Sequence, residues 1–204
     1  MAARSLADLQ GTTLILEAAN VRLEPLAIRH ASDLFAVAQD EEIWRWLYIS
    51  PPTNLDEMQA WITTALAGHA SGREFPFAVV DKHSGRAIGS TRYLYIEPAH
   101  RHLDIGWTWY GRAYWRTAVN TECKYLLLRH AFDMLGCIRV ELTTDLRNER
   151  SQQAIERLGA TREGVLRKYR IVPKDGYHRS SVIYSIIDDE WPALKSRLEQ
   201  MFTR

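Results

Sequence analysis

The chain has 204 residues, of which 46% are hydrophobic and 25% charged, and this is enough for one domain with a sizeable core. Its 26 basic and 25 acidic residues give a formal net charge of +1, so charge offers no basis for binding nucleic acid or a membrane surface. Two cysteines outside any C-x-x-C pair exclude a disulfide scaffold and provide no zinc motif. We therefore expect a single domain over residues 1–204, without a bound metal.

The amino-terminal stretch "MAARSLADLQ" lacks the apolar core of a signal peptide. No apolar run elsewhere approaches the roughly 20 residues that a helix needs to cross a bilayer. These two observations predict a cytoplasmic protein with no membrane partner.

The first half of the chain begins with short strands and two helices. Residues 13–26 read as two short strand pieces around a turn, and residues 27–39 follow with helical spacing. A clearer helix covers residues 54–72, because Asn54 with Glu57 three residues later makes a start similar to a capping box.

Three consecutive strands come next. Residues 74–81 and 86–98 predict a hairpin around a short turn, and residues 101–110 alternate between hydrophobic and other side chains. This alternation places Asp104 on the face opposite Trp107. The hydrophobic positions of the third strand are Leu103, Ile105, Trp107 and Trp109.

The second half mixes helices and strands. We expect a helix over 120–136, a strand over 137–145, a short helix over 148–159, strands over 162–172 and 178–187, and a helix over 188–202. Met134 is expected on the buried face of the first of these helices, while Asn148 begins the short helix and Gly159 ends it. Mixed order with consecutive strands predicts an α+β fold rather than a doubly wound sheet.

Three stretches carry a resemblance to a known family: "LDIGWTWY", "YWRTAVNTECKYLLLRHAF" and "RVELTTDLRNERSQQAIERLGATREGVLR". The chain resembles the GNAT superfamily of acyl-CoA-dependent N-acetyltransferases, and within it the branch of ribosomal-protein N-terminal acetyltransferases. The resemblance covers roughly residues 12–190. It implies a mixed, mostly antiparallel sheet of about seven strands flanked by helices, acetyl-CoA as co-substrate, an amine acceptor, and a homodimer as a plausible assembly.

The family's phosphate-binding signature, Q/R-x-x-G-x-G/A, maps onto Trp115 to Asn120, and its fixed positions are occupied by Trp115, Ala118 and Asn120 instead. Anions bind helix N-termini through backbone N–H groups, so glycine is not indispensable. We expect a pyrophosphate cradle with help from Arg112, while the alternative is a simple helix start capped by Asn120. The cradle residues are Arg116, Thr117, Ala118, Val119, Asn120 and Thr121.

Acyl transfer to an amine needs a group that removes a proton and a donor for the carbonyl oxygen. Asp104 is the first candidate base, and the alternatives are an exposed aspartate or a partner for Arg101 or His102. Glu97, His102 and water-mediated deprotonation are further candidates for the proton acceptor. By resemblance, the backbone of Trp107, Thr108 and Trp109 contacts the pantetheine and the thioester.

Many GNAT enzymes use a tyrosine in the short helix as the acid, and Ile155 stands at that place here. By resemblance to the ribosomal branch, Ser151 is expected to hydrogen-bond the CoA sulfur, and Asn148 to hold the pantetheine amides. The alternative for both residues is capping of the first helical turn.

The acceptor side is expected to have aromatic walls. Residues 44–52 lie between the first two helices, where the family has an acceptor-facing loop, and Trp44, Trp46 and Tyr48 would line it. Tyr169, with Tyr177 and His178, would form the opposite wall. The alternative for these rings is packing onto the sheet.

The leading functional hypothesis is an acetyl-CoA-dependent N-acetyltransferase that acts on a primary amine, such as a protein N-terminus or a small amine. One alternative is a transferase that uses another acyl-CoA such as succinyl-CoA. The other is a non-catalytic acyl-CoA-binding module.

Overall fold

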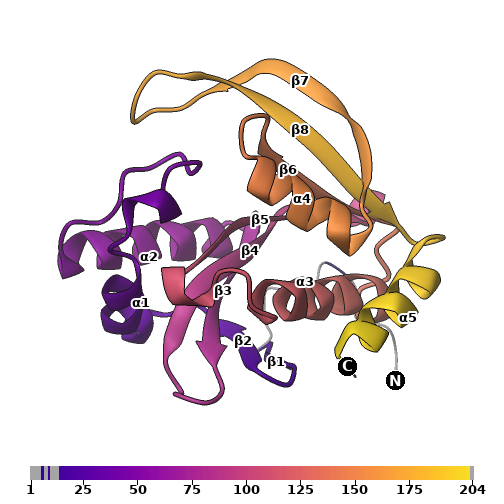
Figure 1. Cartoon of the computed structure of the whole chain (residues 1–204), viewed down its shortest axis with the longest axis horizontal. Helices are drawn as coiled ribbons and strands as arrows, with labels where there is room; N and C mark the ends of the chain where they lie inside the picture. The colour runs from indigo at the N-terminus through magenta and orange to yellow at the C-terminus, as the bar shows by residue number, and fades with distance from the viewer. Residues whose placement is uncertain (1–5, 7–8, 10–13, 203–204) are drawn as a thin grey trace.

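The computed structural model describes Leu6, Leu9 and residues 14–202, so most of the stretch that was expected to lack a signal core lies outside the described residues. One eight-stranded sheet forms its centre, in the order β1-β2-β3-β4-β5-β6-β8-β7 (Figure 1). All neighbouring strands are antiparallel except β5 and β6. The strands are β1 (Leu16–Glu17), β2 (Val21–Pro25), β3 (Glu74–Asp81), β4 (Ala87–Glu97), β5 (His102–Tyr110), β6 (Arg139–Asp145), β7 (Thr161–Ile171) and β8 (His178–Ile187).

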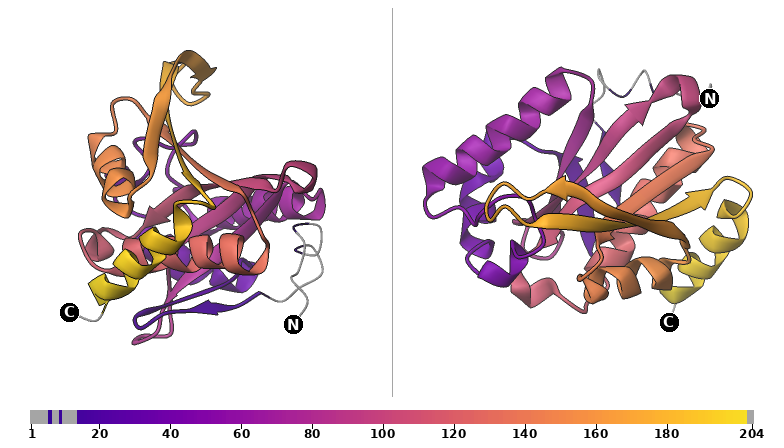
Figure 2. Two further views of the ribbon diagram at one scale, coloured as in Figure 1. Left: turned by 90° about the vertical axis from the view of Figure 1, so that its right-hand side faces the viewer. Right: turned by 90° about the horizontal axis from the view of Figure 1, so that it is seen from above.

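Helices cover both faces of the sheet (Figures 1 and 2). The helices are α1 (Ala31–Val37), α2 (Leu55–Ala70), α3 (Val119–Arg129), α4 (Glu149–Leu158) and α5 (Trp191–Phe202). One hydrophobic cluster joins the sheet to α3, α4 and α5, and a second joins it to α1 and α2. The α+β class and the mostly antiparallel sheet that the sequence predicts are therefore confirmed.

The parallel pair β5–β6 is short, and this positions the site. The two strands pair over three residues only, from His102 opposite Arg139 to Asp104 opposite Glu141. Beyond that point β5 stays paired with β4 and β6 stays paired with β8, so the two strands separate. The edge of β5 that faces the gap carries backbone N–H and C=O groups without a strand partner, which can bind an extended chain.

The alternation expected along β5 fails after Ile105. Leu103 and Ile105 pack toward α3, as expected, but the pairing with β4 shifts between Ser90 and Arg92, and Trp107 has a φ of 49°. This β-bulge reverses the faces, so Trp109 packs with α1 and α2 instead of with α3. The prediction that the four hydrophobic residues share one face is wrong, because one extra residue shifts a two-residue period.

The helix predicted over residues 120–136 ends in a different geometry. A π-helical turn from His130 to Met134 follows α3. This wider turn rotates the face of the helix, and Met134 is 43% exposed, contrary to the prediction that it is buried. Gly136 then leaves the helix with a φ of 64°.

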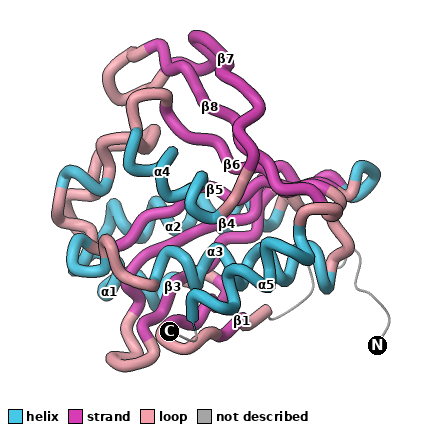
Figure 3. The backbone as a smooth tube through the Cα atoms, turned by 45° about the vertical axis from the view of Figure 1, so that its right-hand side comes forward, coloured by secondary structure: helices cyan, strands magenta, loops and turns pink. Residues whose placement is uncertain are grey.

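The hairpin of β7 and β8 rises from the sheet above α4 and bends over the gap between β5 and β6 (Figures 1 and 3). At its tip, the Lys174 ammonium donates to the carbonyl oxygens of Trp44 at 2.6 Å and Arg45 at 3.1 Å. This contact ties the hairpin to the segment between α1 and α2. No helix within residues 14–202 is both long and apolar enough to cross a membrane.

Candidate active site

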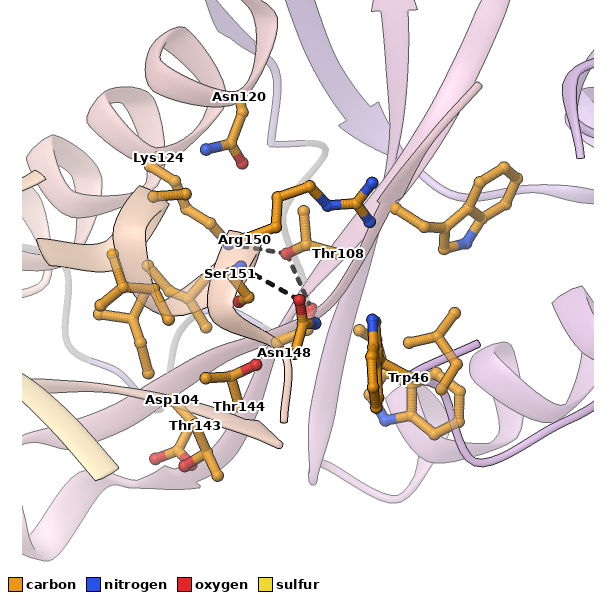
Figure 4. Close-up of a pocket in the computed structure, with 18 of the residues that line it drawn as sticks. Trp46, Asp104, Thr108, Asn120, Lys124, Thr143, Thr144, Asn148, Arg150 and Ser151 are labelled. Carbon is orange, nitrogen blue, oxygen red and sulfur yellow. Dashed lines mark hydrogen bonds between the residues drawn. The ribbon is translucent and has the colours of Figure 1, made fainter. Parts of the chain in front are cut away.

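A cavity of about 1680 Å³ opens where β5 and β6 separate. Its walls come from the N-terminal end of α3, from α4, from the segment 42–48 and from the β7–β8 hairpin. Trp46 lies across this cavity from Lys124 and Asp104 (Figure 4). A pocket for one small ligand usually measures about 300–1,000 Å³, so this cavity has room for two substrates.

The N-terminal end of α3 offers free backbone donors. The N–H groups of Thr117, Ala118, Asn120 and Thr121 find no protein acceptor within residues 14–202. Thr117 accepts the Val119 N–H at 3.3 Å and donates its own proton to the Tyr114 carbonyl. Free N–H groups at the positive end of a helix are an anion-binding arrangement.

Three guanidinium groups gather beside this helix end. The Arg150 guanidinium lies 3.6 Å from the centre of the Trp115 ring, and the Arg112 guanidinium lies 4.6 Å from it. Burial, together with the positive charges of Arg112 and Arg116, lowers the pKa of Arg150. Cations held this close to each other favour a bound anion.

Lys124, one turn into α3, reaches the open edge of β5 (Figure 4). Its ammonium donates to the Thr108 hydroxyl at 2.7 Å, and that hydroxyl lies 2.8 Å from the Thr91 hydroxyl. Lys124 is 6% exposed, and burial lowers its pKa to about 8. No carboxylate within the described part of the chain pairs with its ammonium.

Asp104 lines the cavity at the point where the two strands separate. It is 8% exposed, and burial together with the negative charge of Glu141 raises its pKa to about 7, against the opposing effect of Arg139 and Arg170. Its carboxylate lies 3.2 Å from Nε2 of His102. A carboxyl group that titrates near neutral pH can accept a proton from an amine.

The same cluster brings together three side chains of the kinds that ligate metal ions. Donor atoms of His102, Asp104 and Glu141 all lie within 4.8 Å of one another. Glu141 already accepts a hydrogen bond from the Arg139 guanidinium at 2.8 Å, so the side chain of an arginine supplies a positive charge beside the cluster.

The start of α4 carries the two residues expected to contact CoA, Ser151 at the sulfur and Asn148 at the pantetheine amides. The Asn148 side chain accepts the Ser151 N–H at 3.1 Å, which confirms that Asn148 caps the helix. Both side chains line the cavity, and the Ser151 hydroxyl has no hydrogen-bond partner in the described residues. Ile155 is buried against the sheet at the edge of the same cavity.

The family comparisons agree with this geometry. A model of the acetyltransferase (GNAT) domain matches residues 20–161. The chain belongs to the GNAT acetyltransferase family. A crystal structure of a GCN5-related N-acetyltransferase from Brucella melitensis is 33% identical, with a TM-score of 0.88, and the match covers 95% of this chain and 87% of that chain.

Two more distant solved structures share the GNAT fold. RimJ of Mycobacterium smegmatis, in complex with CoA-disulfide, is 22% identical with a TM-score of 0.74, over 89% of this chain and 88% of that chain. RimL, a ribosomal L7/L12 alpha-N-protein acetyltransferase, is 17% identical with a TM-score of 0.74, over 85% of this chain and 94% of that chain. These two matches show the shared fold, and the family model over residues 20–161 confirms the resemblance to the GNAT superfamily that the sequence motifs indicated.

The predicted cradle residues of this GNAT domain divide into two groups. The side chains of Arg116, Thr117 and Asn120 line the cavity, whereas those of Ala118, Val119 and Thr121 do not. The alternative that Asn120 caps α3 is wrong, because Ala118 is the capping residue. The Asn120 side chain instead accepts from the Tyr110 hydroxyl at 3.3 Å.

The aromatic wall on the acceptor side is smaller than the sequence predicts. Trp44 is 1% exposed and packs against Trp61 and Trp109, so it belongs to the core and not to the cavity wall. Trp46, Tyr48 and Tyr169 do line the cavity. Trp44 differs because its ring donates to the Ala38 carbonyl at 2.8 Å, which anchors it beneath the loop.

Sequence reasoning missed several charged residues that line the cavity, among them Lys124, Glu141, Arg150, Arg170 and Arg179. Arg150 had a usable signal, because it lies two residues after the helix-capping Asn148. Glu141 could also have been found from the sequence, because it stands at an alternating position of β6. Lys124 lies among buried residues of α3, and nothing in the helical pattern indicates that its head group reaches β5.

Proposed function

We propose that this GNAT domain transfers an acetyl group from acetyl-CoA to a primary amine, such as a protein N-terminus or a small amine. One observation carries the proposal: a single cavity joins a helix end rich in free N–H groups and guanidinium groups to an open strand edge that leads to Asp104. The first part suits a pyrophosphate, the second an extended pantetheine chain, and the third an amine.

The donor would be held by residues from three elements. The phosphates would be bound by the free N–H groups at the start of α3 and by three arginine side chains. The N–H groups are those of Thr117, Ala118, Asn120 and Thr121, and the arginines are Arg112, Arg116 and Arg150. The open backbone edge of β5, at Trp107, Thr108 and Trp109, would pair with the pantetheine amides, and Asn148 would contact them from α4. RimJ, which shares the fold, is in complex with CoA-disulfide, and this supports a CoA site of the same kind.

The residues of this chain would supply one proton acceptor and two hydrogen-bond donors to the reaction. The amine nitrogen forms a bond to the thioester carbon, the C–S bond breaks, and Asp104 accepts the proton that the amine loses. A backbone N–H of the β5 bulge would donate to the carbonyl oxygen as negative charge develops on it. The Ser151 hydroxyl would donate a hydrogen bond to the departing thiolate. Holding both substrates in one cavity supplies much of the remaining acceleration.

The acceptor would enter from the side of Trp46, Tyr48 and Tyr169. Trp46 lies across the cavity from Lys124 of α3, so the two substrates would approach Asp104 from different directions. RimL, with the same fold, is a ribosomal L7/L12 alpha-N-protein acetyltransferase, which keeps a protein N-terminus among the candidate acceptors. The cytoplasmic location expected from the sequence stays a prediction.

The deciding experiment is a titration followed by an assay. Acetyl-CoA and succinyl-CoA are titrated into the protein by calorimetry, and thiol release is then followed over a panel of peptides and small amines. Tight acetyl-CoA binding with amine-dependent thiol release is expected. Binding without release for every amine would favour a non-catalytic acyl-CoA-binding module, and faster release with succinyl-CoA would assign a different acyl donor.

A further inference from the structure

A buried arginine on the acceptor side of the cavity lacks the partners that such a group requires. Arg179, on β8, is 6% exposed, and its Nε is buried without a hydrogen bond. No residue in the described part of the chain accepts a hydrogen bond from its guanidinium. The nearest carboxylate oxygen, on Asp145, lies 3.9 Å from Nε. A guanidinium offers five donors, so this group is unusually unsatisfied.

Asp145 is itself occupied by another arginine. Its carboxylate accepts from the backbone N–H of Arg147 at 2.9 Å and from the Arg147 Nε at 3.3 Å. The single carboxylate of Asp145 therefore lies between two guanidinium groups, so it neutralises the positive charge of Arg179 only in part. Burying a charge without full compensation is costly, so an anion that completes the pairing would bind favourably.

The surroundings of Arg179 place it at the acceptor end. Its guanidinium carbon lies 4.8 Å from the centre of the Tyr48 ring, which faces the Trp107 ring at 6.0 Å. A second guanidinium, that of Arg170, lies 5.9 Å from the same Tyr48 ring and donates to the Tyr95 hydroxyl at 2.7 Å. Two arginines thus approach one tyrosine on the cavity wall.

The phosphates of the donor have a separate place. Arg112, Arg116 and Arg150 lie at the α3 end, whereas Arg170 and Arg179 lie on the β7–β8 hairpin and contact the segment between α1 and α2. Arg170 also acts on Asp104, where its charge opposes the raised pKa. Arg170 therefore lies near the group that would accept the proton of the amine, and Arg179 lies beside the same tyrosine as Arg170.

We propose that the acceptor amine carries a carboxylate, and that Arg179 and Arg170 bind this carboxylate. The inference rests on the proposed function and narrows it, from any primary amine to amino acids and to peptides with an acidic residue near the amino end. Guanidinium groups suit this ligand, because their planar fork matches the two oxygens of a carboxylate.

The test uses matched pairs of acceptors with saturating acetyl-CoA. One pair is a free amino acid and its carboxamide, and another is a short peptide with Asp or Asn as second residue. We expect kcat/KM to be about 10- to 150-fold higher for the carboxylate member, the range of one hydrogen bond to a charged group. A wild-type enzyme that prefers the uncharged member of each pair would overturn the inference.

Two variants and a control test whether the preference for acceptors with a carboxylate depends on these two arginines. Arg179→Gln should bring the ratio within each pair close to one, and the exposed Arg170→Gln should reduce it without endangering the fold. Arg167→Gln is the matched control, because Arg167 is exposed on the same hairpin and does not line the cavity. If the control loses the preference equally, net charge and not the pocket is responsible, and the inference is wrong.

Two further experiments distinguish this inference from the alternative explanations. Succinyl-CoA replaces acetyl-CoA, and if Arg179→Gln slows only succinyl transfer, the carboxylate belongs to the acyl group and the inference is overturned. If no amine is acetylated at all, the proposed function fails, and calorimetric binding of the carboxylate amines to the CoA complex decides instead. Binding that Arg179→Gln weakens at least tenfold would support the inference, and equal binding by both proteins would refute it.

Discussion

Asp104 and Glu141 face each other across the last pair of the parallel β5–β6 ladder, and an oxygen of each lies within 4.8 Å of the other. The Arg139 guanidinium donates a hydrogen bond to the Glu141 carboxylate at 2.8 Å. Burial and this neighbouring charge together raise the pKa of Asp104 to about 7. The site therefore contains one carboxylate that pairs with an arginine and one that exchanges its proton near neutral pH.

Asp104→Asn should remove the proton acceptor while keeping size and hydrogen bonding. We expect kcat to fall by roughly 10²-fold or more with acetyl-CoA affinity unchanged. In the wild type, kcat/KM should rise as the pH increases through about 7, because only the ionised carboxylate accepts a proton. A variant with wild-type turnover and the same pH profile would remove Asp104 from the mechanism.

Glu141→Gln tests the coupling between the two carboxylates. Removing the negative charge should lower the pKa of Asp104, although burial continues to raise it. The rising part of the kcat/KM profile should then move to lower pH, with activity at pH 6 increased relative to pH 8. An unmoved profile would show that a different group titrates in the reaction.

The place of Asp104 on β5 follows from the sequence for a physical reason. The alternation along β5 is regular up to Ile105, so the face of Asp104 follows from period two alone. The bulge at Trp107 is not visible in this pattern, because Trp107 and Trp109 are hydrophobic on either face. The same limit explains Trp44 and Trp46, which are alike in sequence but lie in an irregular segment whose path decides which ring is buried.

Other parts of the site depend on contacts between distant segments. Arg150 reaches Trp115 because α4 follows β6, and β6 separates from β5 after only three pairs. Arg179 meets Tyr48 because the β7–β8 hairpin bends back over the segment between α1 and α2. Neither the length of a strand ladder nor the bend of a hairpin can be read from residue types.

Ala118→Trp tests the phosphate cradle at α3. Ala118 is exposed at the start of the helix, so the fold should tolerate the larger side chain. An indole there would block close approach of an anion to the free N–H groups, and we expect acetyl-CoA affinity to fall by well over tenfold. Ala99→Trp is the control, since Ala99 is exposed and outside the cavity. Unchanged calorimetric affinity in folded Ala118→Trp would place the phosphates elsewhere.

Lys124→Met tests whether a buried ammonium is retained for function. Burial lowers the pKa of Lys124 from 10.5 to about 8, so between these values the unfolded chain binds a proton that the folded chain does not. Its contribution to folding free energy therefore improves as pH rises from about 8 to 10.5, and below 8 the full burial penalty applies.

The variant should accordingly be more stable than the wild type at pH 7, with a difference that narrows toward pH 10.5. Thermal melts across this range measure the effect. Acetyl-CoA affinity should fall, because the ammonium lies at Thr108 on the edge of β5 that is expected to bind the pantetheine. Lower stability at pH 7, or a stability difference that does not change with pH, would contradict this account of Lys124.

Ser151→Ala tests how the enzyme manages without the tyrosine that many relatives carry. Ile155 stands at that place and has no proton to give, whereas Ser151 lies one turn earlier and lines the cavity. A free serine is too weak an acid to donate a full proton, so its expected role is a hydrogen bond to the developing thiolate. Losing one hydrogen bond to a charged group costs about 1.5–3 kcal/mol, or roughly 10- to 150-fold in kcat.

The structure shows that the Ser151 hydroxyl can be removed without removing the cap of α4. Asn148 caps α4 through the backbone N–H of Ser151 and not through its hydroxyl, so Ser151→Ala leaves the cap in place. Asn148→Ala is the matched comparison, and loss of the cap should lower stability by about 1 kcal/mol. We expect Ser151→Ala to lower kcat within the stated range while its melting temperature and acetyl-CoA affinity stay close to those of the wild type. Full kcat in Ser151→Ala would leave the thiolate without this donor and would assign Ser151 to the structure of the helix alone.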